Sequence, residues 1–392
     1  MSSIRTRVFL AVIGAAAVAV SAALASATPR NAATFQAHVI DTTLTGGYQV
    51  VIADMNHDGR PDILAVASGL SELRWYENPG WQPHVVVGGL TEPINAAIYD
   101  VDGDSIPEIA LAHDFSDVYQ ESRGTVSLLT HASDPAAPWT RRDIDHVPTS
   151  HRLRFVDVDG TGRRVLVNAP LIGAAALAPD YRDHVPLLMY RPGSWQRERI
   201  GDGDEGVVHG LLPFVWDAGP HESVLTASFL GVFAHRYGNG GWTRTRLVAG
   251  EPAAWPKGGA SDVAVGRIGA ERFIATIEPW HGHQVVVYRH HDGAWEPHVI
   301  DSTIVDGHAI AVGDFSRTGR DDIIVGERGG KRSVYLYRLE NDVTDSWSKT
   351  PLDAGGMAAA GCAVADLNGD TRPDVICIGS ATANLKWYEN RP

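Results

Sequence analysis

Histidines recur at one repeated place along this sequence. His151 and His308 each lie six residues before the first aspartate of a glycine-rich turn, and His209 fits the same place in a weaker copy. Tyr48 occupies that place in the first copy. A neutral imidazole can hold a divalent metal ion or accept a proton. We therefore predict that these residues converge on one site, although a single histidine at such a place more often has a structural role.

A second set of residues with chemical potential follows apolar runs instead of preceding them. Glu278 leads into Trp280 and His281, and Arg328 follows the corresponding run in the next unit. A histidine or Tyr48 would remove a proton beside a carbonyl while a metal ion or Arg328 stabilises the enolate, which are the two requirements of β-elimination. Trp280 offers an apolar face to a sugar ring, or else packs within the fold. The predicted catalytic residues are Tyr48, His151, His209, His281, His308 and Arg328, and the predicted substrate-binding residues are Lys257, Glu278, Trp280 and His113.

Motifs for other reactions are scarce. Serine-hydrolase, zincin, P-loop and dinucleotide-binding patterns do not occur in the sequence. Glycoside hydrolysis by paired carboxylates is an alternative, with Asp114, Glu278 and Glu327 as candidates. That chemistry depends on the separation of two carboxyl groups, which a sequence does not give.

The repeated turns carry oxygen ligands at regular spacing. Asp54, Asn56, Asp58 and Asp62 alternate in the first turn, where Gly59 permits the sharp bend. Oxygen ligands at positions one, three, five and nine suit Ca²⁺, whereas the alternative is an Asx-rich hairpin turn without an ion. We predict structural calcium sites on the face opposite to the other loops. The ligands would be Asp54, Asn56, Asp58, Asp62, Asp100, Asp102, Asp104, Glu108, Asp366, Asn368, Asp370 and Asp374.

The elements that must position these residues form seven similar units. The phrases ADMNHDGRPDIL from Ala53, YDVDGDSIPEIA from Tyr99 and ADLNGDTRPDVI from Ala365 are the clearest copies. Copies are spaced about 40–60 residues apart, as propeller blades are. Each unit has four short runs of β-branched and aromatic residues bounded by Gly, Pro, Asn and Asp, without helical periodicity. We predict an all-β fold, a single seven-bladed β-propeller over residues 28–392 with no second domain.

The last unit lacks its fourth strand, because the sequence after residue 384 copies only a third strand. Phe35–Asp41 (FQAHVID) matches the fourth strands Trp81–Val87 (WQPHVVV) and Trp295–Asp301 (WEPHVID). We predict that this N-terminal strand completes the last blade, which would remove exposed sheet edges.

The turn pattern D-x-N/D-x-D-G-x-x-D/E between two apolar strands resembles the FG-GAP/VCBS repeat family, the propeller type also found in integrin α-subunits. The stretches Ile277–Tyr288 (IEPWHGHQVVVY) and Asp306–Gly330 look like the propeller domain of the aldos-2-ulose dehydratases. They are also similar to propeller polysaccharide lyases that act by β-elimination. The second resemblance implies a carbohydrate ligand or substrate. Those dehydratases carry cupin domains after the propeller, which we do not find in this sequence, so no activity of those domains is expected.

Residues 1–27 have the layout of a secretory signal peptide. Arg5 and Arg7 precede the apolar run Val8–Leu24, and an A-x-A exit ends at Ala27. A membrane anchor is the alternative, because the run approaches the length that spans a bilayer. We predict cleavage and a secreted or periplasmic mature chain without a stable membrane span.

Charge and composition narrow the choice of partners. The formal charge is -14, and loss of residues 1–27 removes two arginines and no acidic residue. An acidic chain without a block of Lys and Arg argues against nucleic acid as a partner.

The two cysteines, Cys362 and Cys377, flank the last turn and should lie nearly opposite in its hairpin. Directly opposed strand positions have Cβ atoms about 4.5–5.5 Å apart, whereas a disulfide prefers about 3.5–4.5 Å. A disulfide would need a closely spaced pair of strand positions, although export to an oxidising compartment favours disulfide formation. We predict two buried thiols.

Taken together, these patterns predict a secreted carbohydrate-active lyase or dehydratase that acts by metal-assisted β-elimination in the central funnel. The alternative is a non-catalytic propeller module that binds glycan or protein on the same face, because a propeller fold alone does not decide function.

Overall fold

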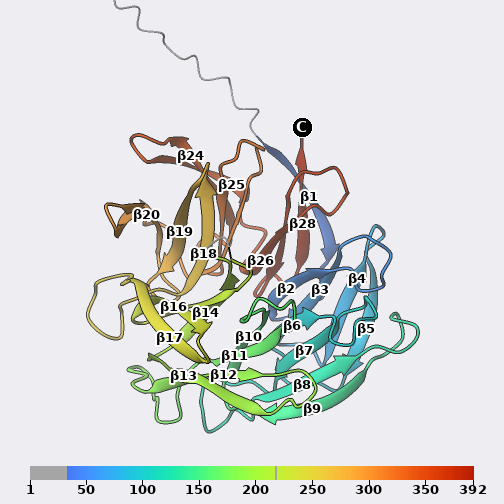
Figure 1. Ribbon diagram of the computed structural model, residues 1–392. Helices are drawn as coiled ribbons and strands as arrows, with labels where there is room; N and C mark the ends of the chain where they lie inside the picture. Colours follow the sequence, from blue (N-terminus) through green and yellow to red (C-terminus); the bar gives the residue numbers. More distant parts are fainter. Residues whose placement is uncertain (1–32, 217–218) are drawn as a thin grey trace, which may run out of the picture. The chain divides into compact units, whose positions relative to one another are not determined.

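The computed structural model describes residues 33–216 and 219–392, so the predicted signal peptide, residues 1–27, lies outside the described residues. The described residues form 28 strands and no helix, arranged as seven antiparallel four-stranded sheets (Figure 1). The prediction of an all-β, seven-bladed propeller is confirmed. No helix in this part of the chain is long and apolar enough to cross a membrane.

The strands follow the chain blade by blade, with the innermost strand of each blade first. Blades 1 to 3 comprise β2 (Gly47–Ala53), β3 (Asp62–Ala67), β4 (Glu72–Glu77) and β5 (Gln82–Gly88); β6 (Asn95–Tyr99), β7 (Glu108–His113), β8 (Thr125–Thr130) and β9 (Thr140–His146); and β10 (Ser150–Val156), β11 (Val165–Pro170), β12 (His184–Tyr190) and β13 (Arg197–Glu205). Blades 4 and 5 comprise β14 (Val208–Phe214), β15 (Ser223–Ser228), β16 (Gly231–Gly238) and β17 (Gly241–Val248); and β18 (Asp262–Ile268), β19 (Glu271–Glu278), β20 (Gln284–His291) and β21 (Ala294–Asp301). Blades 6 and 7 comprise β22 (Gly307–Gly313), β23 (Asp322–Glu327), β24 (Val334–Asn341) and β25 (Ser346–Asp353); and β26 (Ala359–Ala365), β27 (Asp374–Gly379), β28 (Leu385–Arg391) and β1 (Thr34–Asp41).

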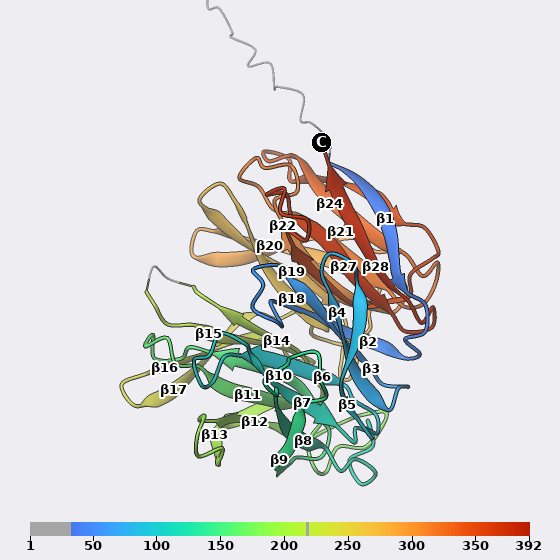
Figure 2. The ribbon, with the colours of Figure 1, turned by 90° about the vertical axis from the view of Figure 1, so that its right-hand side faces the viewer.

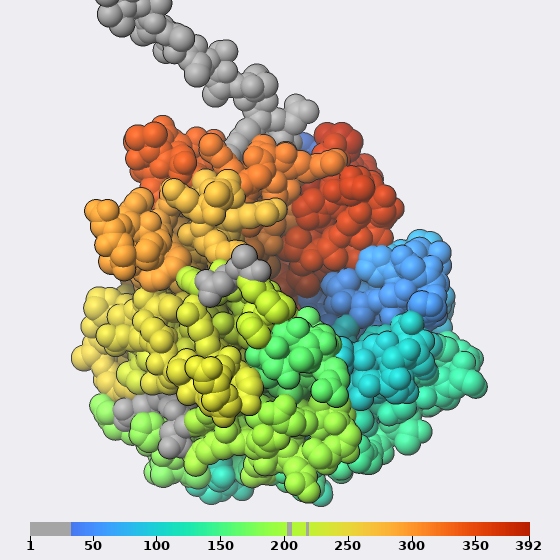
Figure 3. Space-filling view, viewed as in Figure 1, coloured from blue at the N-terminus to red at the C-terminus, as the bar shows by residue number. Residues whose placement is uncertain are grey.

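The innermost strands form a closed ring around the propeller axis. Each of β2, β6, β10, β14, β18, β22 and β26 contacts the innermost strand of both neighbouring blades. The blades therefore succeed one another around the axis in sequence order, so that the first and last blades lie side by side (Figures 2 and 3).

The ring is closed by the N-terminal strand, as the sequence predicts. β1 pairs antiparallel with β28, with Phe35 opposite Asn390 and Val39 opposite Lys386. Tyr76 of blade 1 donates a hydrogen bond of 2.5 Å to Asp41 at the end of β1. Blade 7 is thus built from both ends of the described chain and tied to blade 1.

The hydrophobic core lies between the blades. In six of the seven blades, every residue of the second strand is buried, as in β3 and β7. The fourth strands β1 and β21 are instead largely exposed or half-buried. A second strand has neighbouring blades on both of its faces, and this explains why its sequence is a continuous apolar run such as ILAVA in β3.

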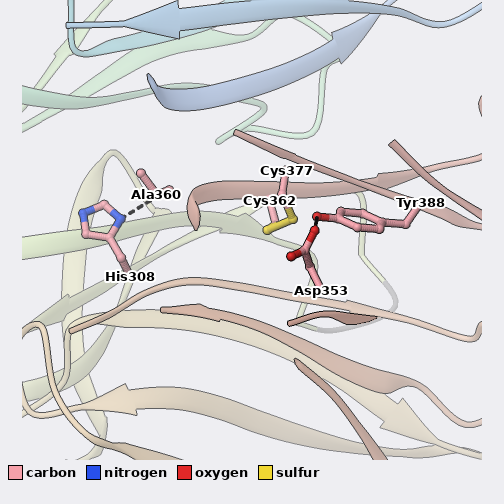
Figure 4. Close-up of a disulfide and its surroundings, with 6 residues drawn as sticks. All are labelled: His308, Asp353, Ala360, Cys362, Cys377 and Tyr388. Carbon is pink, nitrogen blue, oxygen red and sulfur yellow. Dashed lines mark hydrogen bonds between the residues drawn. A yellow bond between two sulfur atoms is a disulfide. The ribbon is translucent and has the colours of Figure 1, made fainter. Parts of the chain in front are cut away.

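The prediction of two free thiols is wrong. Cys362 and Cys377 form a disulfide between β26 and β27 (Figure 4). They are directly opposed in the ladder, with their Cα atoms 4.2 Å apart. That spacing is the narrow type of antiparallel pair, in which side chains approach more closely than in the wide type. The sequence places the two cysteines opposite each other but does not reveal which type of pair they occupy.

Candidate functional site

A β-bulge near the start of the innermost strand sets the site. In five blades the register shifts by one residue at this place, for example between Gly47 and Gln49 in β2. Bulges re-aim a side chain and are frequent beside active sites. The extra residues are Tyr48, His151, His209, His308 and Ala360.

Three imidazoles meet at the axis. His209, His281 and His308 each offer a ring nitrogen, and these three nitrogens lie within 4.8 Å of one another. The Nε2 atoms of His209 and His281 are 3.4 Å apart. His209 and His308 lie in the innermost strands β14 and β22, whereas His281 lies in the loop after β19. We call these three residues the histidine cluster. His209 and His308 are 1% exposed, whereas the side chain of His281 is 29% exposed and opens the cluster to solvent.

Backbone carbonyls fix the orientation of two of these rings. His209 Nδ1 lies 3.1 Å from the Ser261 carbonyl oxygen, and His308 Nδ1 lies 2.6 Å from the Ala360 carbonyl oxygen (Figure 4). A carbonyl only accepts, so both Nδ1 atoms carry the proton and both Nε2 atoms keep a lone pair. His308 Nε2 is buried and has no hydrogen-bond partner among the described residues.

Tyr48 and His151 form a pair beside the cluster. The Tyr48 hydroxyl lies 2.6 Å from His151 Nε2, and the His151 and His209 ring centroids are 5.0 Å apart. The guanidinium of Arg152 lies 5.3 Å from the centre of the Tyr48 ring. It also donates to the His209 carbonyl at 2.9 Å and thereby joins the pair to the cluster.

The exposed side of the cluster holds an ion pair. Arg328 reaches both carboxylate oxygens of Asp306, at 3.2 and 3.0 Å. His281 Nδ1 lies 3.0 Å from Arg328 Nη2 and 3.5 Å from Asp306 Oδ1. His281 can therefore accept from Arg328 in one tautomer or face Asp306 with a protonated Nδ1 in the other.

All four histidines are held neutral. Burial lowers the pKa of His151 and His209 well below its ordinary value, and the charge of Arg152 lowers it further. Burial also lowers the pKa of His308 and His281, and Arg328 adds to the effect. Neutral imidazole is the form that ligates a metal ion or accepts a proton.

Aromatic rings line the cluster on the side of blades 3 to 5. Trp280 packs on His281 with ring centroids 4.6 Å apart, and Tyr181 and Phe229 each lie 5.6 Å from Trp280. Trp255 lies 5.2 Å from Phe229 and extends the group. We call Tyr181, Phe229, Trp255 and Trp280 the aromatic group.

Among the described residues, three of the predicted substrate-binding residues make no hydrogen bond or ring contact with the histidine cluster. His113 is buried in blade 2, where its Nε2 is 2.8 Å from the Ser127 hydroxyl. Glu278 is buried in blade 5 and accepts hydrogen bonds from Thr276 and Tyr288. Lys257 is exposed on the loop before β18.

The carboxylates considered for glycoside hydrolysis are engaged within their own blades. Thr125 donates to Asp114 at 2.6 Å in blade 2, and Tyr335 donates to Glu327 at 3.1 Å in blade 6. Burial raises the pKa of Glu278 to about 7. These three carboxylates belong to three different blades, and the structure does not favour them as a catalytic pair.

The acidic turns hold their backbone through the predicted ligands. In the second turn, Asp100, Asp102 and Asp104 each offer a carboxylate oxygen within 4.8 Å of the others. Asp100 also accepts the backbone N–H groups of residues 103 and 105 at 2.7 and 3.0 Å. In the first turn, buried Asp62 accepts two backbone N–H groups, and burial raises its pKa to about 6. The geometry is compatible both with a hairpin held by these contacts and with an added cation.

Sequence reasoning missed three polar contributors to the site and most of the aromatic group. Arg152 follows His151, Asp306 precedes His308 by two residues, and Ser261 anchors His209 through its carbonyl oxygen. The proximity of Arg152 to His151 and of Asp306 to His308 was the available signal, whereas Ser261 has no histidine near it in the sequence. The rest of the aromatic group gave none, because its members come from loops of different blades.

Comparison with known proteins finds two families of propeller sequence in this chain. Residues 123–291 match the family of the aldos-2-ulose dehydratase β-propeller domain. Over these residues the chain is similar to that family. Residues 54–111 and 314–377 match FG-GAP-like repeats. Both resemblances given by the sequence are thus supported, although the dehydratase match covers Ile277–Tyr288 and ends before Asp306–Gly330.

One relative with a described activity is aldos-2-ulose dehydratase of Phanerodontia chrysosporium. It is 24% identical over 384 residues, an alignment that covers 83% of this chain. The chain spans 42% of the length of that relative.

Proposed function

We propose that this protein is an exported carbohydrate-active lyase or dehydratase that acts by metal-assisted β-elimination in the central funnel. The observation that carries the proposal is the histidine cluster, with its neutral rings and its Arg328–Asp306 pair on the exposed side. Relationship to a dehydratase propeller supports a carbohydrate as the ligand.

The histidine cluster suits a divalent metal ion. His209 and His308 present Nε2 lone pairs because their Nδ1–H groups are bound to carbonyl oxygens, and such an outer hydrogen bond is typical of metal-ligating histidine. The buried, unpartnered Nε2 of His308 lacks any other role in the described structure. His281 would complete the set with Nε2 in the tautomer whose protonated Nδ1 faces the Asp306 carboxylate. Three histidines with an open position are a common catalytic zinc set.

A bound metal ion would polarise the substrate carbonyl and stabilise negative charge on its oxygen. Tyr48 would take the proton from the carbon beside that carbonyl while its own hydroxyl proton moves to His151 Nε2. Burial and Arg152 disfavour a lasting imidazolium at His151. The proton would therefore pass on to the oxygen that leaves the next carbon, which gives a carbon–carbon double bond and a released hydroxyl compound or water.

A non-catalytic glycan-binding module is the second candidate. The aromatic group favours it, since Trp280 and its neighbours could hold a sugar ring by stacking without any reaction. Binding without product formation would distinguish this function from the first.

The proposal also includes export of the protein and calcium binding by its acidic turns. The Cys362–Cys377 disulfide supports an oxidising compartment, secreted or periplasmic, after removal of residues 1–27. We also propose that the acidic turns bind Ca²⁺. The strongest candidate is the second turn, where Asp100, Asp102 and Asp104 bring three carboxylates close together.

The test is an absorbance screen for unsaturated sugar products, using keto-sugars and uronic-acid glycans with the purified protein. We expect turnover that is lost in His308→Ala and kept in His235→Gln, a buried histidine of blade 4 away from the histidine cluster. Sugar binding by calorimetry with no absorbance change would support the binding module. The absence of both binding and turnover with keto-sugars and with uronic-acid glycans would contradict the proposal.

A further inference from the structure

A cavity of about 210 Å³ lies on the propeller axis beside the histidine cluster. Residues of all seven innermost strands line it, from Tyr48 of β2 to Cys362 of β26. His308 belongs both to its wall and to the histidine cluster.

Two arginines of one strand turn into this cavity. Arg152 and Arg154 stand two places apart in β10, so they share a face of the strand, and both line the cavity. Arg152 is 6% exposed, and Arg154 is partly buried. Their bonds go to neutral acceptors. Arg152 donates to the His209 carbonyl, and its Nη2 lies 3.5 Å from His209 Nε2. Arg154 donates to Asn95 Oδ1 and to the carbonyl of Leu153. Within the described part of the chain, neither guanidinium has a carboxylate oxygen within 4.0 Å.

The charge of this cavity is unbalanced. Asp262 of β18 is the one acidic residue in the described lining, so two guanidinium groups face a single carboxylate. Burial lowers the pKa of Arg154 to about 10, and the charge of Arg152 contributes to the shift. Burial also raises the pKa of Asp262, which weakens the one available counter-charge. Buried charge without a partner is costly, and a protein relieves that cost with a counter-ion or a paired group.

We propose that this axial cavity binds a small inorganic anion, of which chloride is the test case, through Arg152 and Arg154. A guanidinium presents several N–H donors in a fixed fork, which suits an anion in a confined space. The two side chains supply donors that their neutral acceptors do not use up. This site goes beyond the proposed function, because it requires neither a metal ion nor a sugar.

The test is the thermal unfolding midpoint as chloride replaces gluconate at constant ionic strength. An anion that binds only the folded state stabilises it by mass action. We expect a saturable rise in the midpoint for the wild type and for Arg163→Gln, which removes an exposed arginine. Arg154→Gln should weaken the apparent chloride affinity at least tenfold.

Asp262→Asn provides an opposite test that does not depend on the folding of the arginine variant. Removal of the competing carboxylate should tighten chloride binding at least threefold while keeping an oxygen for the Val263 N–H. No chloride response in the wild type, or the same response in Arg154→Gln, would overturn the proposal. Metal content and sugar turnover do not enter this measurement, so its failure leaves the proposed function untouched.

Discussion

The Tyr48–His151 pair gives the most exact prediction. His151 is 1% exposed, its Nδ1 has no hydrogen-bond partner among the described residues, and Tyr48 is the partner of its Nε2 at 2.6 Å. Tyr48→Phe removes the hydroxyl and leaves both ring nitrogens of a buried imidazole unpaired.

The expected cost follows from that loss. A buried polar group left without its hydrogen bond destabilises a protein by about 1–3 kcal/mol. We expect Tyr48→Phe to lower the free energy of unfolding by this amount, as measured by urea denaturation. Tyr99→Phe is the matched control, because the Tyr99 hydroxyl donates to the Gly162 carbonyl at the surface and should cost less than about 0.5 kcal/mol.

A double-mutant cycle isolates the pair. If the cost arises from the orphaned imidazole, Tyr48→Phe should be nearly neutral in a His151→Leu background, which gives a coupling energy of about 1–3 kcal/mol. The same variant should reduce turnover by about 10²–10⁴-fold if Tyr48 is the proton acceptor. Equal costs in both backgrounds would refute the reasoning about the pair.

Three further predictions concern stability. Burial lowers the pKa of His235 from 6.5 to about 4, so the unfolded chain binds this proton first and the free energy of unfolding falls as pH drops from 6.5 towards 4, by up to about 3 kcal/mol. Urea denaturation across this pH range should show a smaller loss in His235→Gln, whereas exposed His291→Gln should lose as much as the wild type. Parallel curves for the wild type and His235→Gln would contradict this prediction. Replacing Cys362 and Cys377 together by alanine should lower the free energy of unfolding in urea by about 3 kcal/mol, since the disulfide closes a separation of 15 residues; an unchanged value would count against the bond. A chelator should lower the melting temperature and Ca²⁺ should restore it, with a weaker response in Asp102→Asn, whereas an unaffected melt would identify the turns as hairpins without an ion.

Much of the fold could be predicted because the sequence repeats show how many blades the propeller has and which strands each blade contains. The clear turn copies give the number of units, and the likeness of Phe35–Asp41 to Trp295–Asp301 identifies the closing strand. Units four and five have eroded turns, yet their strands keep the apolar runs that packing between blades requires.

Part of the site could be predicted by counting from the turns, because a bulge at a constant place brings the same position of five blades to the axis. Lys257 does not occupy that place, because β18 begins at Asp262 and shows no register shift at its start. Arg152 and Asp306 escaped prediction because contacts across blades, and not sequence spacing, define their roles.

The content of divalent transition metal in the purified protein tests the central claim most directly. Elemental analysis after exchange with Zn²⁺ should find one equivalent per chain bound in the wild type and in His235→Gln, and less than a tenth of that in His209→Ala. Each variant removes one buried histidine, so a general effect of the substitution would appear in both. A wild type that binds no Zn²⁺, or a His209→Ala variant that keeps it, would contradict a metal centre at the histidine cluster.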